Sequence, residues 1–133
     1  MPDFKEKIKL AREEREKGDL KTALKMFLEV DTSSIDQSNQ LFDYLGELGL
    51  TYLLLRDYDK AKESYEKALE LPESSENDSY RAVVLKHLSN PKFNEENPEK
   101  ALENALEARE LALKVGRKDL VWFDGGVISA LFQ

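Results

Sequence analysis

Few residues in this 133-residue chain have the types and spacing that catalysis requires. The adjacent carboxylates Glu13-Glu14 and Glu95-Glu96 could act as acid and base, but both pairs lie in charge-rich segments typical of solvated helix faces. No serine or threonine pairs with the single histidine, His87, in a recognisable motif, so we interpret it as structural. Gly125-Gly126 lacks the lysine and hydroxyl residue of a phosphate-binding loop. We therefore expect neither an enzyme nor a cofactor.

Composition excludes several further classes of protein. The chain has no cysteine, which rules out a disulfide framework and a thiolate metal site, and one histidine cannot form a cluster. The net charge of −7 disfavours binding to nucleic acid, because proteins that bind nucleic acids usually carry a basic face. No apolar run approaches the ~18–20 residues of a membrane span. We expect one cytoplasmic domain over residues 1–133 that binds no metal, nucleic acid or membrane.

The helices that must position any functional residues can be predicted from the capping residues, prolines and glycines that begin and end them. Strong helix formers dominate, and only four prolines and six glycines interrupt them. The residues Asp31–Ser34 are expected to cap a third helix, Asn97 with Pro98 to start a sixth, and Gly116 to end it. Seven helices are predicted, at about residues 2–17, 20–30, 35–56, 58–71, 79–88, 98–115 and 119–132.

One pair of these helices has the pattern of a tight hairpin. Small residues at helical spacing allow two backbones to approach, and large aromatic residues fill the space around them. The small residues are Gly49, Ala61 and Ala68, and the aromatic residues are Tyr52, Tyr58 and Tyr65.

The same frame recurs along the chain. An aliphatic residue followed by a small one occurs four times, at intervals of 38, 40 and 40 residues: Leu10-Ala11, Leu48-Gly49, Leu88-Ser89 and Ile128-Ser129. Alanines follow at matching intervals, at Ala23, Ala61 and Ala101. The recurrence predicts a repeat protein built from helical hairpins.

The segment Leu41–Pro72 resembles the tetratricopeptide repeat at nearly every signature position. The resemblance implies an all-α, right-handed superhelical solenoid of three antiparallel hairpins, at residues 4–34, 42–72 and 79–115, followed by a seventh helix at 119–132. The period of 38–40 residues exceeds the usual 34 of the family. The third hairpin departs most, because Pro98 and Ala105 stand where Tyr58 and Tyr65 stand in the second.

The resemblance also implies a binding groove lined by the first helix of each hairpin. The residues carried onto this groove are Lys5, Ile8, Arg12, Arg15, Asp43, Gly46, Leu50, Leu53, Lys86 and Asn90. They predict a basic end and an apolar middle, suited to a peptide with acidic and hydrophobic residues. Alternatively, Leu50, Leu53 and Leu54 are core residues of a sandwiched helix.

One subtype of the family holds a peptide's terminal carboxylate with lysines, asparagines and an arginine. The matching positions are Ile8, Arg12, Glu47, Val83 and Lys86. Glu47 would repel a carboxylate, so this subtype is disfavoured.

The last predicted helix is apolar on nearly every side, whereas a terminal repeat usually presents a polar outer face. This pattern suggests a fragment of a longer array, self-association through Trp122, Phe123 and Phe132, or a docking surface for a partner, and we favour the first two. The sequence as a whole predicts a non-enzymatic scaffold that binds a protein or peptide. The alternatives are a peptide-sensing or regulatory segment of a larger protein and a homodimerising module.

Overall fold

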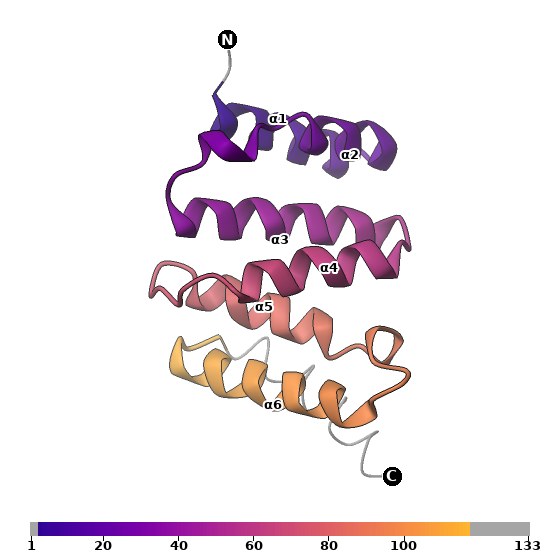
Figure 1. Cartoon of the computed structure of the whole chain (residues 1–133), viewed down its shortest axis with the longest axis vertical. Coiled ribbons are helices and arrows are strands. Elements are labelled where there is room, and N and C mark those ends of the chain that lie inside the picture. The colour runs from indigo at the N-terminus through magenta and orange to yellow at the C-terminus, as the bar shows by residue number, and fades with distance from the viewer. Residues whose placement is uncertain (1–2, 118–133) are drawn as a thin grey trace. The chain divides into compact units, whose positions relative to one another are not determined.

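The computed structural model describes residues 3–117, and the regular structure within them is entirely helical (Figure 1). The prediction of an all-α protein is therefore confirmed. The helices are α1 (Phe4–Glu16), α2 (Leu20–Leu28), α3 (Ser38–Leu54), α4 (Tyr58–Leu69), α5 (Asp78–Leu88) and α6 (Pro98–Lys114), with short 3-10 helices η1 (Thr32–Ser34) and η2 (Pro91–Phe93). The expected seventh helix, with Trp122, Phe123 and Phe132, lies outside the described residues.

Aspartate side chains begin three of these helices. Asp3, Asp19 and Asp57 each accept a hydrogen bond from the backbone N–H three residues later, at 3.0, 3.2 and 3.3 Å. These bonds satisfy donors that the first helical turn leaves without an intrahelical partner. Gly116, at φ +76°, ends α6 as expected, with a 2.8 Å bond from the N–H of Arg117 to the carbonyl of Ala112.

The third helix begins later than the sequence suggested. Asp31 accepts hydrogen bonds from the backbone N–H and the hydroxyl of Ser33, and so caps η1 rather than α3. Ile35 then adopts an extended conformation and is buried, and α3 starts at Ser38 after Gln37, whose side chain makes no capping bond. The predicted start at Ile35 was wrong, because burial of that side chain holds the backbone extended between the two helices.

The contacts divide the chain into two compact units, residues 1–72 and 73–133. In the first unit, α1 packs against α2 and α3 against α4 as two helical hairpins, and both α1 and α2 contact α3. In the second unit, α5 packs against α6, and η2 lies in their connection. All three hairpins predicted from the short turns are therefore present.

The core of the first unit is filled by aromatic side chains. Tyr65 of α4 lies against Gly49 of α3 so closely that a Cβ atom at Gly49 would stand 2.6 Å from the ring carbon Cε1. Phe27 and Phe42 are also fully buried. The Tyr44 hydroxyl donates a 2.9 Å hydrogen bond to the Phe27 carbonyl, which ties α3 to α2. Of the aromatic residues expected to fill the α3–α4 hairpin, Tyr65 and Tyr52 are buried and Tyr58 is half-buried.

The core of the second unit combines small side chains of α6 and buried amides with larger apolar side chains of α5 and η2, namely Val84, Leu85, Leu88 and Phe93. Four alanines of α6 are almost completely inaccessible to solvent: Ala101, Ala105, Ala108 and Ala112. The last carbonyl of α5, that of Leu88, accepts bonds from the amides of Asn94 at 2.7 Å and Asn104 at 3.2 Å. These two amides satisfy a buried backbone group that the helix end would otherwise leave unbonded.

Candidate binding surface

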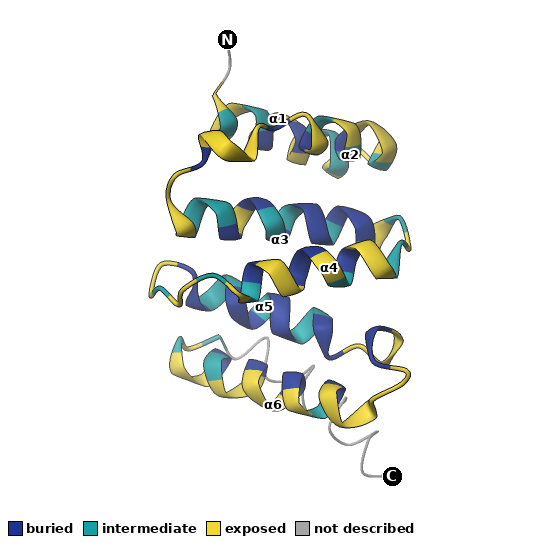
Figure 2. Cartoon of the chain, viewed as in Figure 1, coloured by how far each residue is buried: buried dark blue, intermediate teal, exposed yellow. Residues whose placement is uncertain are grey.

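Helix α3 is buried on most sides but retains one open stripe. Between positions 42 and 54 only Asp43 and Leu54 are exposed, while Glu47 and Leu50 are half-buried (Figure 2). Spacings of four, three and four residues place these four side chains along one face of the helix. We call Asp43, Glu47, Leu50 and Leu54 the α3 stripe. Leu54 has 48 % of its surface exposed and lies one turn from the half-buried Leu50, so the end of the stripe is apolar.

Two arginines of α1 border this stripe through Glu47. The Arg15 guanidinium contacts the Glu47 carboxylate at 2.5 Å, and it also donates to the Glu47 carbonyl and the Thr51 hydroxyl at 3.2 and 3.3 Å. It lies 5.8 Å from the centre of the Phe27 ring. The Arg12 guanidinium is 3.8 Å from the same carboxylate oxygen. The ion pairs therefore place the exposed part of α1 beside the stripe.

The two arginines differ in environment. The side chains of Arg15 and Glu47 are only 9 % and 12 % exposed, whereas that of Arg12 is 48 % exposed. A charge pair so little hydrated is stable only with good geometry and further hydrogen bonds, which Thr51 and the backbone supply. The nearby Tyr65 has its pKa raised above the ordinary tyrosine value, chiefly by burial. It therefore stays neutral beside this pair.

The residues predicted to line the groove fall into three groups. Four are exposed: Lys5, Arg12, Asp43 and Asn90. Three are half-buried: Leu50, Leu53 and Lys86. Ile8 and Gly46 are buried, and Arg15 is engaged with Glu47. The first unit brings Arg12, Asp43 and Leu50 to one surface, while Lys86 and Asn90 belong to the second unit.

The part played by Glu47 was missed by sequence reasoning, which treated it only as an obstacle to a terminal carboxylate. Opposite charges on α1 and α3 were visible in the sequence. Which charged residues of α1 contact which residues of α3 depends on how far one helix is shifted along the other. The spacing of residues within each helix cannot predict that shift. Glu47 in fact pairs with Arg15 and Arg12 of α1, and its side chain is largely buried between the two helices.

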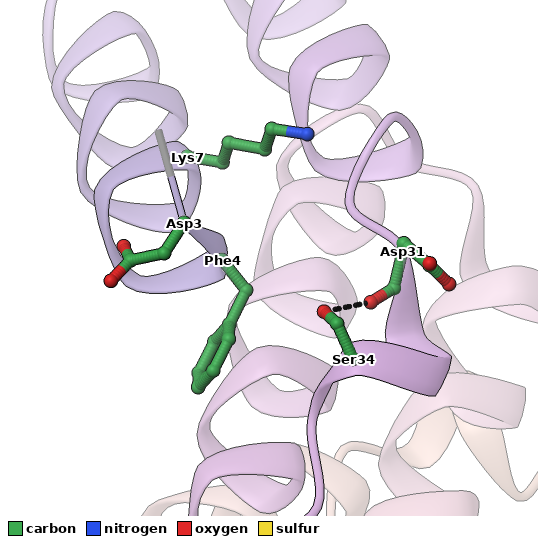
Figure 3. A pocket seen from close by; sticks show the side chains of 5 residues that line it. All are labelled: Asp3, Phe4, Lys7, Asp31 and Ser34. Carbon is green, nitrogen blue, oxygen red and sulfur yellow. Dashed lines mark hydrogen bonds between the residues drawn. The ribbon is translucent and has the colours of Figure 1, made fainter. Parts of the chain in front are cut away.

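A separate hollow of about 410 Å³ lies where α1 begins near η1. It is lined by Asp3, Phe4, Lys7, Asp31 and Ser34 (Figure 3). Its two carboxylates already act as helix caps, and hydrogen bonds from Ser33 lower the pKa of Asp31. This hollow contains none of the residues predicted for the groove.

Within residues 3–117 no helix is long and apolar enough to cross a membrane.

Comparison with known proteins supports the assignment of the repeat. Residues 42–71, which comprise most of α3 and the whole of α4, match the family model described as tetratricopeptide repeat. The match assigns one tetratricopeptide repeat to this hairpin. No curated protein matches the chain significantly.

Among solved structures, the chain is similar to the crystal structure of PcrH from Pseudomonas aeruginosa. The TM-score is 0.72 at 19 % sequence identity, and the match covers 98 % of this chain and 92 % of PcrH. At that level of identity the similarity concerns the fold alone.

Proposed function

We propose that this protein is a non-enzymatic scaffold that binds a segment of another protein on the surface formed by α1 and the α3 stripe. The proposal includes a right-handed superhelical solenoid in which the first helices of the hairpins line one concave face, as the tetratricopeptide resemblance implies. We also propose a cytoplasmic location. Such a scaffold could act as a peptide-sensing or regulatory segment of a larger protein.

The observation that carries the proposal is the exposed apolar surface on α3. Leu54 is half-exposed and Leu50 is half-buried one turn away, on a helix whose other central positions are largely covered. Full burial of a leucine contributes about 1.5–3 kcal/mol, so covering the exposed half of Leu54 contributes on the order of 1 kcal/mol. A partner must therefore add further contacts, and the half-exposed Arg12 beside the stripe offers one.

The test compares two leucines with similar exposure. Leu54 on α3 and Leu28 on α2 are 48 % and 55 % exposed, so Leu54→Glu and Leu28→Glu remove matched apolar surfaces. Proteins captured by the tagged full chain from a lysate of the source organism would be quantified by mass spectrometry. We expect Leu54→Glu to remove most of a captured partner and Leu28→Glu to leave it unchanged.

Circular dichroism and urea midpoints of both variants provide the control for folding. Equal capture by the wild-type chain and by a folded Leu54→Glu variant would show that the α3 stripe is not the binding surface. Unfolding of Leu54→Glu would show instead that this leucine is a packing residue.

A second candidate function is self-association through the apolar C-terminal segment. It is favoured by the sequence of residues 119–132, which has few polar side chains on any face. Light scattering of the full chain should then give the mass of a dimer, and Trp122→Glu with Phe132→Glu should reduce it to that of a monomer. A wild-type chain that is already monomeric would refute this candidate.

A further inference from the structure

The charges around Glu47 do not balance at the surface. One carboxylate is shared by two guanidinium groups, those of Arg15 and Arg12. Arg15 is committed to the interior, because its two terminal nitrogens contact the carboxylate, the Glu47 carbonyl and the Thr51 hydroxyl. With side chains only 9 % and 12 % exposed, Arg15 and Glu47 form an internal pair that fixes α1 against α3.

Arg12 is the surplus cation of this group. Its Nε atom lies 3.8 Å from the Glu47 carboxylate, which is longer than a hydrogen bond, and 48 % of its side chain is exposed. Since Glu47 is neutralised by Arg15, the three side chains together leave a net charge of +1 at the position of Arg12. An incoming carboxylate could pair with Arg12 without displacing any internal contact.

The apolar part of the stripe lies close to this cation. Leu50 and Leu54 follow Glu47 by three and seven residues, which corresponds to about 4.5 and 10.5 Å along the helix axis. An extended peptide advances about 3.3 Å per residue, so the same distances correspond to roughly one to three residues of a bound segment. The exposed Asp43, one turn before Glu47 on α3, and the exposed Glu16, one turn after Arg12 on α1, would repel a carboxylate. These charges restrict the favourable position for a negative group to Arg12.

From these contacts we infer the chemistry of the partner, an inference that rests on the proposed function. The bound segment carries an aspartate or glutamate side chain that pairs with Arg12. Within about three residues it carries one or two aliphatic side chains that cover Leu50 and Leu54. Arg15 and Glu47 are positioning residues, which hold Arg12 beside the leucines but do not touch the partner.

The test is selection of binders from a random twelve-residue peptide library, displayed with blocked C-termini, on the immobilised full chain. We expect the enriched peptides to combine an acidic residue with Leu, Ile or Met at most three positions away. The affinity of the best peptide is then measured by fluorescence anisotropy. Because like charges placed opposite each other are costly, Arg12→Glu should weaken binding about tenfold or more. The matched reversal Lys21→Glu, at an exposed site on α2, should change it less than twofold.

A charge swap makes the test specific. Replacing the acidic residue of the selected peptide by lysine should abolish binding to the wild-type chain and restore it to the Arg12→Glu variant. Arg12→Gln, which removes the charge without reversing it, should give an intermediate affinity with an unchanged thermal unfolding curve.

The possible outcomes separate this inference from the proposed function. Peptides that depend on Leu54 but show no acidic preference, or that bind Arg12→Glu as well as wild type, would overturn the inference and leave the scaffold function standing. Binding that appears only when the peptide C-terminus is free would assign Arg12 to a terminal carboxylate and overturn the aspartate or glutamate assignment. Failure to enrich any peptide sensitive to Leu54→Glu would overturn both.

Discussion

The hairpin of α3 and α4 and the hairpin of α5 and α6 solve the same packing problem with different side chains. In the first, Gly49 leaves room for the ring of Tyr65, which is almost fully buried. In the second hairpin, Ser89 occupies the position that corresponds to Gly49, and Ala105 occupies the position that corresponds to Tyr65. Both residues are buried. The frame of the repeat is kept although the volume of its central pair changes.

The second hairpin also contains buried amides beside this pair. In the α5–α6 hairpin, the amides of Asn94 and Asn104 both donate to the carbonyl of Leu88, the residue before Ser89. Both hairpins bury apolar side chains, and the α5–α6 hairpin adds these two amide bonds to its buried alanines and to Val84 and Leu85. The contacts differ in size, and the single histidine of the chain, His87, lies on α5, so mutations and pH can separate the two hairpins.

The largest expected effect is the loss of the ring in the α3–α4 hairpin. Tyr65→Ala removes a buried aromatic side chain and should lower the free energy of unfolding by about 3–5 kcal/mol. Urea unfolding followed by circular dichroism measures this loss. A decrease below 1 kcal/mol would mean that the tyrosine is not the centre of this packing.

The second effect comes from the opposite side of the same contact. Gly49→Ala would place a Cβ atom 2.6 Å from the Tyr65 ring, and overpacking of this kind costs about 1–3 kcal/mol. In a Tyr65→Leu background the same substitution should cost much less, because the ring carbons that it strikes are gone. A double-mutant cycle measures this coupling, and additive losses would contradict the proposed contact.

The third effect distinguishes the hairpins by pH. Burial, together with the charge of Lys86, lowers the pKa of His87 on α5 to about 4, and this is the only histidine of the chain. Between pH 6.5 and 4 the unfolded chain binds a proton that the folded chain does not, so stability falls as the pH decreases. The loss between pH 7.5 and pH 5 should be about 2 kcal/mol.

A matched variant isolates this contribution from that of the carboxylates. His87→Gln should remove the part of the change in the free energy of unfolding between pH 7.5 and pH 5 that is due to the histidine. In the wild-type chain, hydrogen exchange at pH 5 should show faster opening of α5 than of α3. The same pH dependence in the wild-type chain and in His87→Gln would contradict the assignment.

A fourth and smaller effect concerns the amides of the second unit. Asn94→Ala removes the 2.7 Å bond to the buried Leu88 carbonyl and should cost about 1–2 kcal/mol. Asn104→Ala should cost less, since its bond is longer at 3.2 Å. Urea unfolding of the single and double variants checks this order. Because the carbonyl keeps one partner in each single variant, the double variant should lose more than the sum.

The smallest effect lies in the turns. Arg56 adopts φ +64° at the end of α3, where Gly18 with φ +93° occupies the matching turn after α1. A left-handed conformation costs a residue with a Cβ atom about 1 kcal/mol, so Arg56→Gly should raise stability by up to about that amount. Thermal unfolding should shift upward for Arg56→Gly and downward for Gly18→Ala. No shift in either variant would mean that the backbone relaxes at these turns.

Much of the fold could be predicted from local features of the sequence. Strong helix formers, the start at Asn97 with Pro98 and the stop at Gly116 marked helices, and the repeated small and aromatic residues marked the hairpin of residues 42–71. The start of α3 could not be predicted in this way, because Ile35 is extended for the sake of its own burial. Asp31 caps η1 instead. This 3-10 helix has only three residues, which is too short to show a pattern of apolar spacing.

For the candidate surface, the sequence by itself determined which side chains share a helix face, because the helical period sets that directly. Tertiary structure decided which of them remain at the surface. Arg12 and Arg15 are three residues apart and looked equivalent, yet one is half-exposed and the other is held against Glu47. The physical reason is that exposure depends on the shift and distance between α1 and α3, which packing sets between helices and not within them.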